Sequence, residues 1–332
     1  MNKLTILSLL SIFFIIIIEC ENNKKNTQLL EIESSLKVIN DSIYIARVEK
    51  ILFTGKNIYI TEAKQHSVFI IDEKLNFKNY FGRHGYGPGE FNIPISINSI
   101  DNLFFVYNDG TRKIIVYDST GLFVKDIDSP TQFPLRFALD KSKNIYVSAN
   151  QINAKGPLLK IDYNGNIIKN FGGWFLPKKK WQRNTRNLRH VFINENNRLI
   201  CVSCTEPFIE IYNLDGLLID KIDISGNTYL KHTVKHYKKL YSEMEKDAHS
   251  SSFYTLFRDA CYYKNSLYLL YYSENKRFDS ILKYKIDGHK IRFQKNYKIN
   301  TRNKYVLKTL CVSDSYIYVY DSYMSQLLKL KL

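Results

Sequence analysis

The sequence predicts an all-β fold, a single six-bladed β-propeller, and three observations support this prediction. The chain of 332 residues contains 25 Tyr and 20 Phe, residue types that favour strands over helices. Short apolar runs are broken by turns rich in Asp, Asn and Gly, a pattern typical of strands joined by tight turns. The runs recur in units of about four strands, with terminal turns at Asp72, Asp118, Asp162, Asp215, Asp287 and Asp321.

The inner strand of each unit can be aligned on an apolar residue that is followed, at a constant offset, by an aromatic or aliphatic residue. The aligned pairs are Leu52 with Tyr59, Ile97 with Phe104, Leu139 with Tyr146, Ile193 with Ile200, Cys261 with Tyr268 and Cys311 with Tyr318. This alignment gives six units, the last with only three strands. We therefore expect residues 35–48 to supply the missing outer strand and close the ring, because an open ring exposes sheet edges.

One unit, Phe81–Gly121, carries a specific motif. It begins G-x-G-x-G-E-F-x-x-P, continues through two strands separated by polar turns, and ends in I-V-Y-D and a glycine. The unit resembles an NHL repeat, and the chain resembles the bacterial six-bladed β-propeller lipoproteins that carry such repeats. The matching residues are Gly85, Gly87, Gly89, Glu90, Phe91, Pro94, Asn108, Arg112, Ile115, Val116, Tyr117, Asp118 and Gly121. The resemblance implies the propeller fold and a place in the cell envelope, and it implies no particular ligand.

Residues 1–19 read as a secretory signal. Lys3 precedes a nearly unbroken apolar run, Leu4–Ile18, which is short for a membrane-spanning helix. Cys20 follows directly, an arrangement that resembles a lipoprotein signal in which the cysteine becomes the lipidated first residue. Glu19 departs from the small residue usual at this position, so an uncleaved membrane anchor is the alternative.

This interpretation divides the chain into three parts. Residues 20–34 are expected to be the lipidated N-terminus and a flexible tether, and residues 35–332 the propeller. The domain is then expected outside the cytoplasm, attached to the membrane through its lipid, on the outer membrane or facing the periplasm.

Two connections between units are longer than the period allows. Gly172–His190 is rich in aromatic and basic residues, and Gly226–Phe257 has the apolar spacing of a helix from about 228 to 247. Like Gly82–Pro94, they join an outer strand to the next inner strand, and connections of this type emerge on one face of a propeller. We call this the loop face and expect it to bind a ligand, because loops on a rigid scaffold often carry function.

The candidate binding residues lie in these connections. They are Arg83, His84, Trp174, Lys178, Lys179, Lys180, Trp181, Arg183 and Arg186, and the histidines expected there are His84, His190, His232 and His236. The net charge of +16 can steer anionic partners toward the protein. We expect a protein or an anionic glycan as partner, and the export signal argues against a nucleic acid.

The sequence contains no motif for catalysis, phosphate binding or a dinucleotide, so no catalytic residue, cofactor or metal is expected. Cys201 and Cys204 form C-x-x-C within a strand, where positions three apart point to opposite faces. Cys261 and Cys311 align with apolar core positions and are expected to be small buried side chains, with a disulfide between them less favoured because equivalent points of neighbouring blades are far apart.

Two functions follow from these observations. The first is a non-catalytic binding or scaffold propeller that uses the loop face. The second is a metal-dependent propeller enzyme, lactonase- or lyase-like, with its site in the central channel. Asp259, Asn194 and Glu62 are the candidate metal ligands for that enzyme, provided that their oxygens converge.

Overall fold

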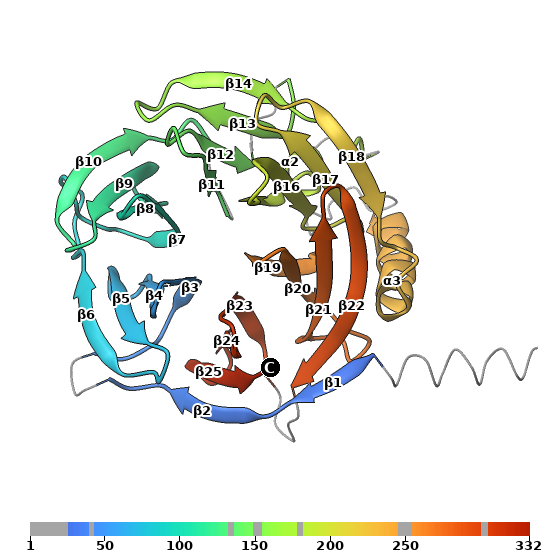
Figure 1. Cartoon of the computed structure of the whole chain (residues 1–332). Coiled ribbons are helices and arrows are strands. Elements are labelled where there is room, and N and C mark those ends of the chain that lie inside the picture. Colours follow the sequence, from blue (N-terminus) through green and yellow to red (C-terminus); the bar gives the residue numbers. More distant parts are fainter. Residues whose placement is uncertain are drawn as a thin grey trace, which may run out of the picture.

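A computed structural model describes residues 26–39, 43–131, 136–148, 155–177, 182–244, 254–299 and 305–332. These residues form six sheets arranged around a central axis, as Figure 1 shows, and all strand pairs but one are antiparallel. The predicted all-β six-bladed propeller is thereby confirmed.

Each blade runs outward from the axis in chain order. Blade 1 contains β3 (Val48–Thr54), β4 (Asn57–Glu62), β5 (Ser67–Asp72) and β6 (Phe77–Phe81). Blade 2 contains β7 (Pro94–Ile100), β8 (Leu103–Asn108), β9 (Lys113–Asp118) and β10 (Phe123–Asp128). Blade 3 contains β11 (Ala138–Leu139), β12 (Ile145–Ser148), β13 (Leu158–Ile161) and β14 (Ile167–Phe171).

The remaining blades follow the same order. Blade 4 contains β15 (Arg189–Ile193), β16 (Arg198–Ser203), β17 (Phe208–Asn213) and β18 (Leu218–Asp223). Blade 5 contains β19 (Phe257–Tyr263), β20 (Ser266–Tyr272), β21 (Phe278–Asp287) and β22 (Lys290–Ile299). Blade 6 contains β23 (Leu307–Val312), β24 (Tyr316–Asp321) and β25 (Gln326–Lys331).

The hydrophobic core lies between neighbouring blades. Blades 1 and 2 share a cluster in which Tyr59 and Phe81 pack against Phe104 and Tyr117. The second and third strands of a blade are covered on both faces, so their sequences are almost continuously apolar, as in β9. The outer strands are more exposed, as the burial of β10 shows.

The turn between the third and fourth strands is built in the same way in four blades. In blade 1 the carboxylate of Asp72 accepts hydrogen bonds from the backbone amides of Lys74 and Asn76, both at 2.9 Å. Asp118, Asp162 and Asn213 accept the equivalent pairs of bonds in blades 2, 3 and 4. In blade 4 the turn-forming residue is therefore Asn213, two positions before the expected Asp215.

The N-terminal segment closes the ring by pairing with the last blade, as expected, but the pairing strand begins before the expected range 35–48. β2 (Ile32–Leu36) pairs antiparallel with β25 and completes blade 6. β1 (Thr27–Leu30) pairs in parallel with β22 as a fifth strand of blade 5, at the lower right of the ring in Figure 1. Strands thus begin before the expected boundary at residue 35. The segment expected to be a tether contains β1 and the start of β2. It is part of the fold, because Leu30 is buried in the core between blades 5 and 6.

The predicted helix between blades 4 and 5 is confirmed as α3 (Thr228–Met244). Leu230, Val234, Tyr237, Tyr241 and Met244 form its buried face, which packs on blades 4 and 5 at the outer rim of the ring. The other described helix is the single turn α2 (Gln182–Thr185). In the described ranges, neither helix has the length and apolar character needed to cross a membrane.

Candidate functional site

The connections between blades lie on one face of the ring, as expected for the loop face. Contacts at the axis show that the inner strands of three blades begin at the same level. Asp259 is hydrogen-bonded to Lys50 and Thr309, and each of these residues lies near the start of its strand. The connections that enter these strands therefore emerge at the same end.

The connection from blade 3 to blade 4 is held in a defined shape by one buried side chain. The amide oxygen of Asn187 accepts a hydrogen bond from the backbone nitrogen of Phe175 at 2.7 Å. Its amide nitrogen donates to the carbonyl oxygens of Phe175 at 2.7 Å and Arg183 at 2.6 Å. The two halves of the connection are thereby tied together around α2.

Arg186 links this connection to α3. Its guanidinium stacks on the rings of Phe175, at 4.4 Å, and Tyr241, at 3.9 Å, and donates two hydrogen bonds to the carboxylate of Glu206. Burial raises the pKa of Glu206, although the charge of Arg186 opposes this rise. A guanidinium between two aromatic faces is well oriented and desolvated, which strengthens its interactions.

A groove lies between the connection and the helix, with a volume of about 340 Å³. Its walls combine aromatic and aliphatic residues with a few polar groups. The lining residues are Phe175, Leu176, Arg186, Thr205, Glu206, Pro207, Val234, Tyr237, Lys238, Tyr241, Ser242 and Leu256. We call it the loop–helix groove. Leu176 is 73% exposed at its edge.

Basic side chains follow the exposed side of α3 beside the groove. Lys231, Lys235, Lys238 and Lys239 are all exposed, and their spacing places them along one stripe of the helix. Only Lys239 forms an ion pair among the described residues, a 3.8 Å contact with Glu243. The stripe therefore offers positive charge to a partner that lies in the groove.

Three of the predicted binding residues lie in the described part of the connection from blade 3 to blade 4. Arg186 lines the groove, and the Arg183 guanidinium lies over the ring of Trp174, at 4.3 Å. Lys178, Lys179, Lys180 and Trp181 lie outside the described residues.

Arg83 and His84 lie elsewhere on the loop face, between blades 1 and 2. Arg83 pairs with Glu90 at 2.9 Å, and the ring of His84 lies against that of His66, at 4.2 Å. Gly82, with a φ of +83°, lies under the ring of Phe91, which leaves no space for a side chain. This tight crossover is separate from the loop–helix groove.

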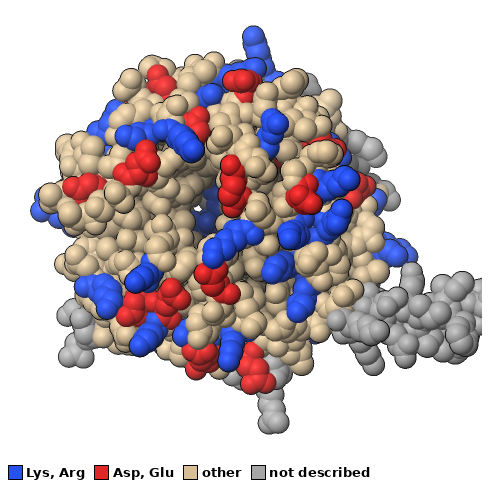
Figure 2. Space-filling model, in the orientation of Figure 1, with Lys and Arg blue, Asp and Glu red and all other residues tan. Residues whose placement is uncertain are grey.

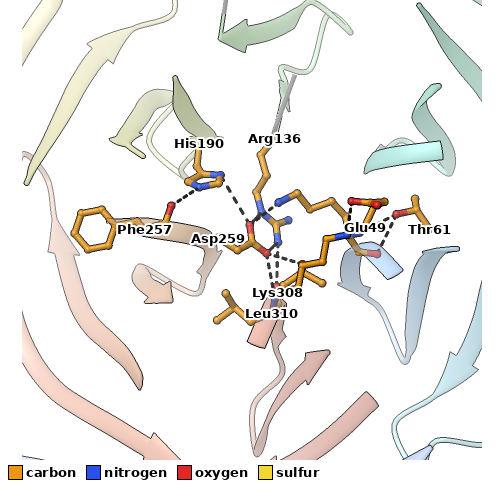
Figure 3. A network of polar contacts seen from close by, with 10 residues as sticks. Glu49, Thr61, Arg136, His190, Phe257, Asp259, Lys308 and Leu310 are labelled. Atoms are coloured by element: carbon orange, nitrogen blue, oxygen red, sulfur yellow. Dashed lines mark hydrogen bonds and ion pairs between the residues drawn. The ribbon is translucent and has the colours of Figure 1, made fainter. Parts of the chain in front are cut away.

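A second arrangement of polar side chains fills the centre of the ring, as Figure 3 shows. The carboxylate of Asp259 accepts five hydrogen bonds. The donors are Lys50 Nζ at 2.9 Å, Arg136 Nε at 2.7 Å, Arg136 Nη2 at 2.6 Å, Thr309 Oγ1 at 2.5 Å and the Leu310 amide at 3.1 Å. One carboxylate thus connects blades 1, 3, 5 and 6, and we call this set the axial network.

The members of the axial network occupy equivalent positions. Lys50, Asp259 and Thr309 each follow a bulge near the start of an inner strand, and Arg136 and His190 take the same place in blades 3 and 4. The sequence alone indicated only Asp259. A polar residue two positions before the aligned residues Leu52 and Cys311 was the available signal for Lys50 and Thr309. The same rule misses Arg136 and His190, because the alignment is offset by one position in their blades.

His190 was expected in a surface loop, and this expectation is wrong. The residue lies in β15 and is fully buried, with its Nε2 3.3 Å from the carbonyl oxygen of Phe257. Its Nδ1 lies 3.9 Å from the Asp259 carboxylate. Burial lowers the pKa of His190 to about 3, and the charge of Lys50 contributes, so the imidazole is neutral.

The candidate metal ligands do not converge. Burial alone would raise the pKa of Asp259, but the charges of Arg136 and Lys50 hold it well below its usual range. Glu62 instead accepts hydrogen bonds from the backbone amides of Ala46, Arg47 and Gln65. Asn194 stabilises the turn before β16. Within the described ranges, no three His, Cys, Asp or Glu side chains form a group that could hold a metal ion.

The cysteines of the described residues have free thiols, so Cys261 and Cys311 form no disulfide. Both line a cavity at the ring axis. Cys311 is buried as expected, whereas Cys261 packs against the core and is only partly buried.

Comparison with known families identifies the chain. The profile of the family DUF5128, described as a 6-bladed beta-propeller, matches residues 12–223. The protein belongs to this family. No curated protein matches the sequence significantly.

Solved structures with the same fold are distant in sequence. A protein described as exported, from Bacteroides fragilis, superimposes with a TM-score of 0.59 at 15% identity, covering 92% of this chain and 95% of its own. A DUF4221 member from Bacteroides vulgatus superimposes with a TM-score of 0.57 at 11% identity, covering 91% of this chain and 97% of its own. The third structure is a catalytically inactive virginiamycin B lyase from Staphylococcus aureus with quinupristin. It superimposes with a TM-score of 0.52 at 13% identity, covering 88% of this chain and 82% of its own. At these identities the similarity shows the fold alone.

Proposed function

We propose that this protein is a non-catalytic binding propeller of the cell envelope, and that its loop–helix groove docks an acidic segment of a protein partner. The observation that carries the proposal is the groove itself. The two longest insertions of the chain meet there, and Asn187 and Arg186 hold its wall in a defined shape.

The lining of the groove favours a polypeptide. Phe175, Val234, Tyr237 and Tyr241 offer apolar and aromatic contacts, while Thr205 and Ser242 offer hydroxyl groups. Grooves of this composition recognise side chains as well as polar backbone groups. Exposed Leu176 at the edge adds an apolar contact that a sugar would use poorly.

The surrounding charge favours an acidic partner. The lysine stripe on α3 borders the groove at Lys238, and Arg186, which is paired with Glu206, lies on its other side. Rim charges of one sign steer an oppositely charged partner during association. The overall charge of +16 acts in the same direction over longer distances.

The lactonase- or lyase-like alternative is not favoured by the axial network. Asp259 already accepts five hydrogen bonds, and two cations surround it. A metal ion would have to displace Lys50 or Arg136 before it could bind there.

Selection from a displayed library of random peptides tests the proposed partner class. We expect the wild-type protein to enrich peptides that combine Asp or Glu with an apolar or aromatic residue. Leu176→Ser should weaken binding of an enriched synthetic peptide several-fold, whereas the matched change Leu122→Ser, at a 67% exposed position before β10, should not. Enrichment of neutral or basic peptides would contradict the acidic class. Binding to sulfated or uronate glycans on an array, without any peptide, would contradict the protein class.

The cell-envelope location is a separate part of the proposal, supported by the apolar run at residues 4–18 and by Cys20 after it. We expect Cys20→Ser to move the protein from the membrane fraction to the soluble periplasmic fraction. A variant that stays in the membrane would indicate an uncleaved anchor, and a wild-type protein found in the cytoplasm would exclude the location.

A further inference from the structure

A cavity of about 230 Å³ lies at the ring axis, beyond the axial network. It is lined by residues further along the inner strands, among them Leu52, Asn98, Phe192, Cys261 and Cys311. It therefore lies toward the face opposite to the loop face. Figure 2, viewed along the axis, shows a hollow at the centre of the ring with basic atoms inside it. We call this space the central cavity.

Arg136 contributes the charged group of the central cavity. The residue is only 7% exposed, yet it lines the cavity. Its Nε and Nη2 donate to Asp259, and Nη2 also donates to the carbonyl oxygen of Leu310. The third nitrogen, Nη1, makes no hydrogen bond within the described residues, so its two N–H groups are available to a ligand.

The charges around the cavity are unbalanced. Burial would lower the pKa of Arg136, but Asp259 raises it, so the guanidinium stays protonated. Burial lowers the pKa of Lys50, although Asp259 opposes this change. In its protonated form Lys50 is a second cation beside the single carboxylate of Asp259, and neutral His190 adds no charge. A buried excess of positive charge is costly unless an anion approaches it.

The walls of the cavity combine apolar side chains with polar groups. Leu52, Ala138 and Phe192 surround it, and burial raises the pKa of Cys261 to about 11, so this thiol is neutral and does not repel an anion. Asn98 and Ser99 are further polar residues in the lining. The combination suits a molecule with one negatively charged end and an apolar body.

We propose that the central cavity binds a small organic carboxylate, with the carboxylate on Arg136 Nη1 and the apolar body against Leu52 and Phe192. A planar guanidinium matches the geometry of a carboxylate better than that of a neutral group. This site is independent of the loop–helix groove, which lies on the other face.

Isothermal titration calorimetry of the purified protein with benzoate tests the proposal. Benzyl alcohol is the neutral comparison of similar size, and sulfate is the anion without an apolar body. We expect benzoate to bind with one-to-one stoichiometry and at least tenfold more tightly than either. Equal binding of benzyl alcohol would overturn the role of charge. Equal binding of sulfate would overturn the role of the apolar walls.

Two variants locate the site. Cys261→Phe fills the cavity without altering any charge and should abolish benzoate binding, whereas Arg183→Gln removes a positive charge from the opposite face and should leave it unchanged. Arg136→Gln should also abolish binding, and circular dichroism shows whether this variant is folded. Benzoate binding that survives in folded Cys261→Phe would place the ligand elsewhere and overturn the proposal.

Discussion

At the scale of single residues, one carboxylate organises the centre of the molecule. Asp259 is fully buried and receives hydrogen bonds from blades 1, 3 and 6 in addition to its place in blade 5. Neighbouring blades in a propeller otherwise contact one another mainly through apolar side chains, so the axial network adds a directional link across the ring.

We predict that Asp259→Asn destabilises the protein by roughly 3–5 kcal/mol, because it leaves Lys50 and Arg136 buried without a counter-charge. Unfolding in urea, followed by tryptophan fluorescence, measures the change. Asp128→Asn, at an exposed position on β10, is the matched control and should change stability by less than about 0.5 kcal/mol. Equal stability of the two variants would mean that the axial network contributes little.

His190 predicts a dependence of stability on pH. Its pKa is about 3 in the folded protein, below its ordinary value of 6.5, so the unfolded chain takes up a proton first as the pH falls. The contribution of His190 is complete above pH 6.5 and is lost as the pH falls toward 3, at up to about 1.4 kcal/mol per pH unit.

Urea unfolding at pH 7 and pH 5 measures this effect. We expect His190→Gln to reduce the loss of stability between these values by up to about 2 kcal/mol. His232→Gln, on the exposed side of α3, should leave the loss unchanged. A wild-type slope in the His190 variant would contradict the assignment.

The residue scale also shows where sequence alignment succeeds and fails. Three of the aligned pairs are directly opposite each other in the first hairpin of their blade: Leu52 with Tyr59, Cys261 with Tyr268 and Cys311 with Tyr318. In the other blades the partners of Phe104, Tyr146 and Ile200 are Ser99, Ala138 and Phe192. The alignment assumed that every inner strand has an apolar residue at the aligned position and that every first hairpin has the same length. Blade 2 instead has polar Asn98 at the position that corresponds to Leu52, and blades 3 and 4 have longer turns, stabilised by the side chains of Asp140 and Asn194.

At the scale of elements, ring closure depends on two short strands. β2 covers the edge of β25, and β1 covers the edge of β22. The sequence predicted closure by an N-terminal strand because blade 6 lacked one. It could not locate the strand, because β2 alternates polar and partly buried residues and resembles a solvated tether.

A truncated chain tests the importance of closure. A protein that begins at residue 37 lacks both strands and loses the burial of Leu30, which alone is worth about 2 kcal/mol. We expect its melting temperature to fall clearly below that of a chain that begins at Asn26, which keeps both strands. Identical melting temperatures would show that the sheet edges need no cover.

The helix α3 was predictable because its apolar residues follow helical spacing, and the loop–helix groove was not. The groove depends on Asn187, whose side chain fixes the connection, and on Tyr241, which meets Arg186 across a separation of 55 positions in the chain. Contacts at such separations leave no periodic signal in the sequence.

At the scale of the whole molecule, charge should govern association with the proposed partner. Figure 2 shows acidic and basic side chains intermingled on the face it presents. We therefore expect local clusters such as the lysine stripe of α3 to add to the effect of the net charge of +16.

We predict that replacing Lys235, Lys238 and Lys239 by Gln slows association of an acidic peptide about tenfold and weakens its dependence on salt. Replacing Lys141, Lys285 and Lys290, exposed lysines near turns at the opposite ends of the blades, removes the same charge and should have a much smaller effect. Stopped-flow fluorescence at low and high ionic strength measures both. Equal slowing in the two triple variants would mean that only net charge matters.

Hydrogen–deuterium exchange of the wild-type protein, with and without an acidic peptide selected for binding, tests the central claim most directly. If the loop–helix groove is the docking site, the amides of residues 182–188 and of α3 become protected, while those of the inner hairpins on the opposite face do not change. Protection confined to blades 1 and 2, or to the strands around the central cavity, would contradict the account.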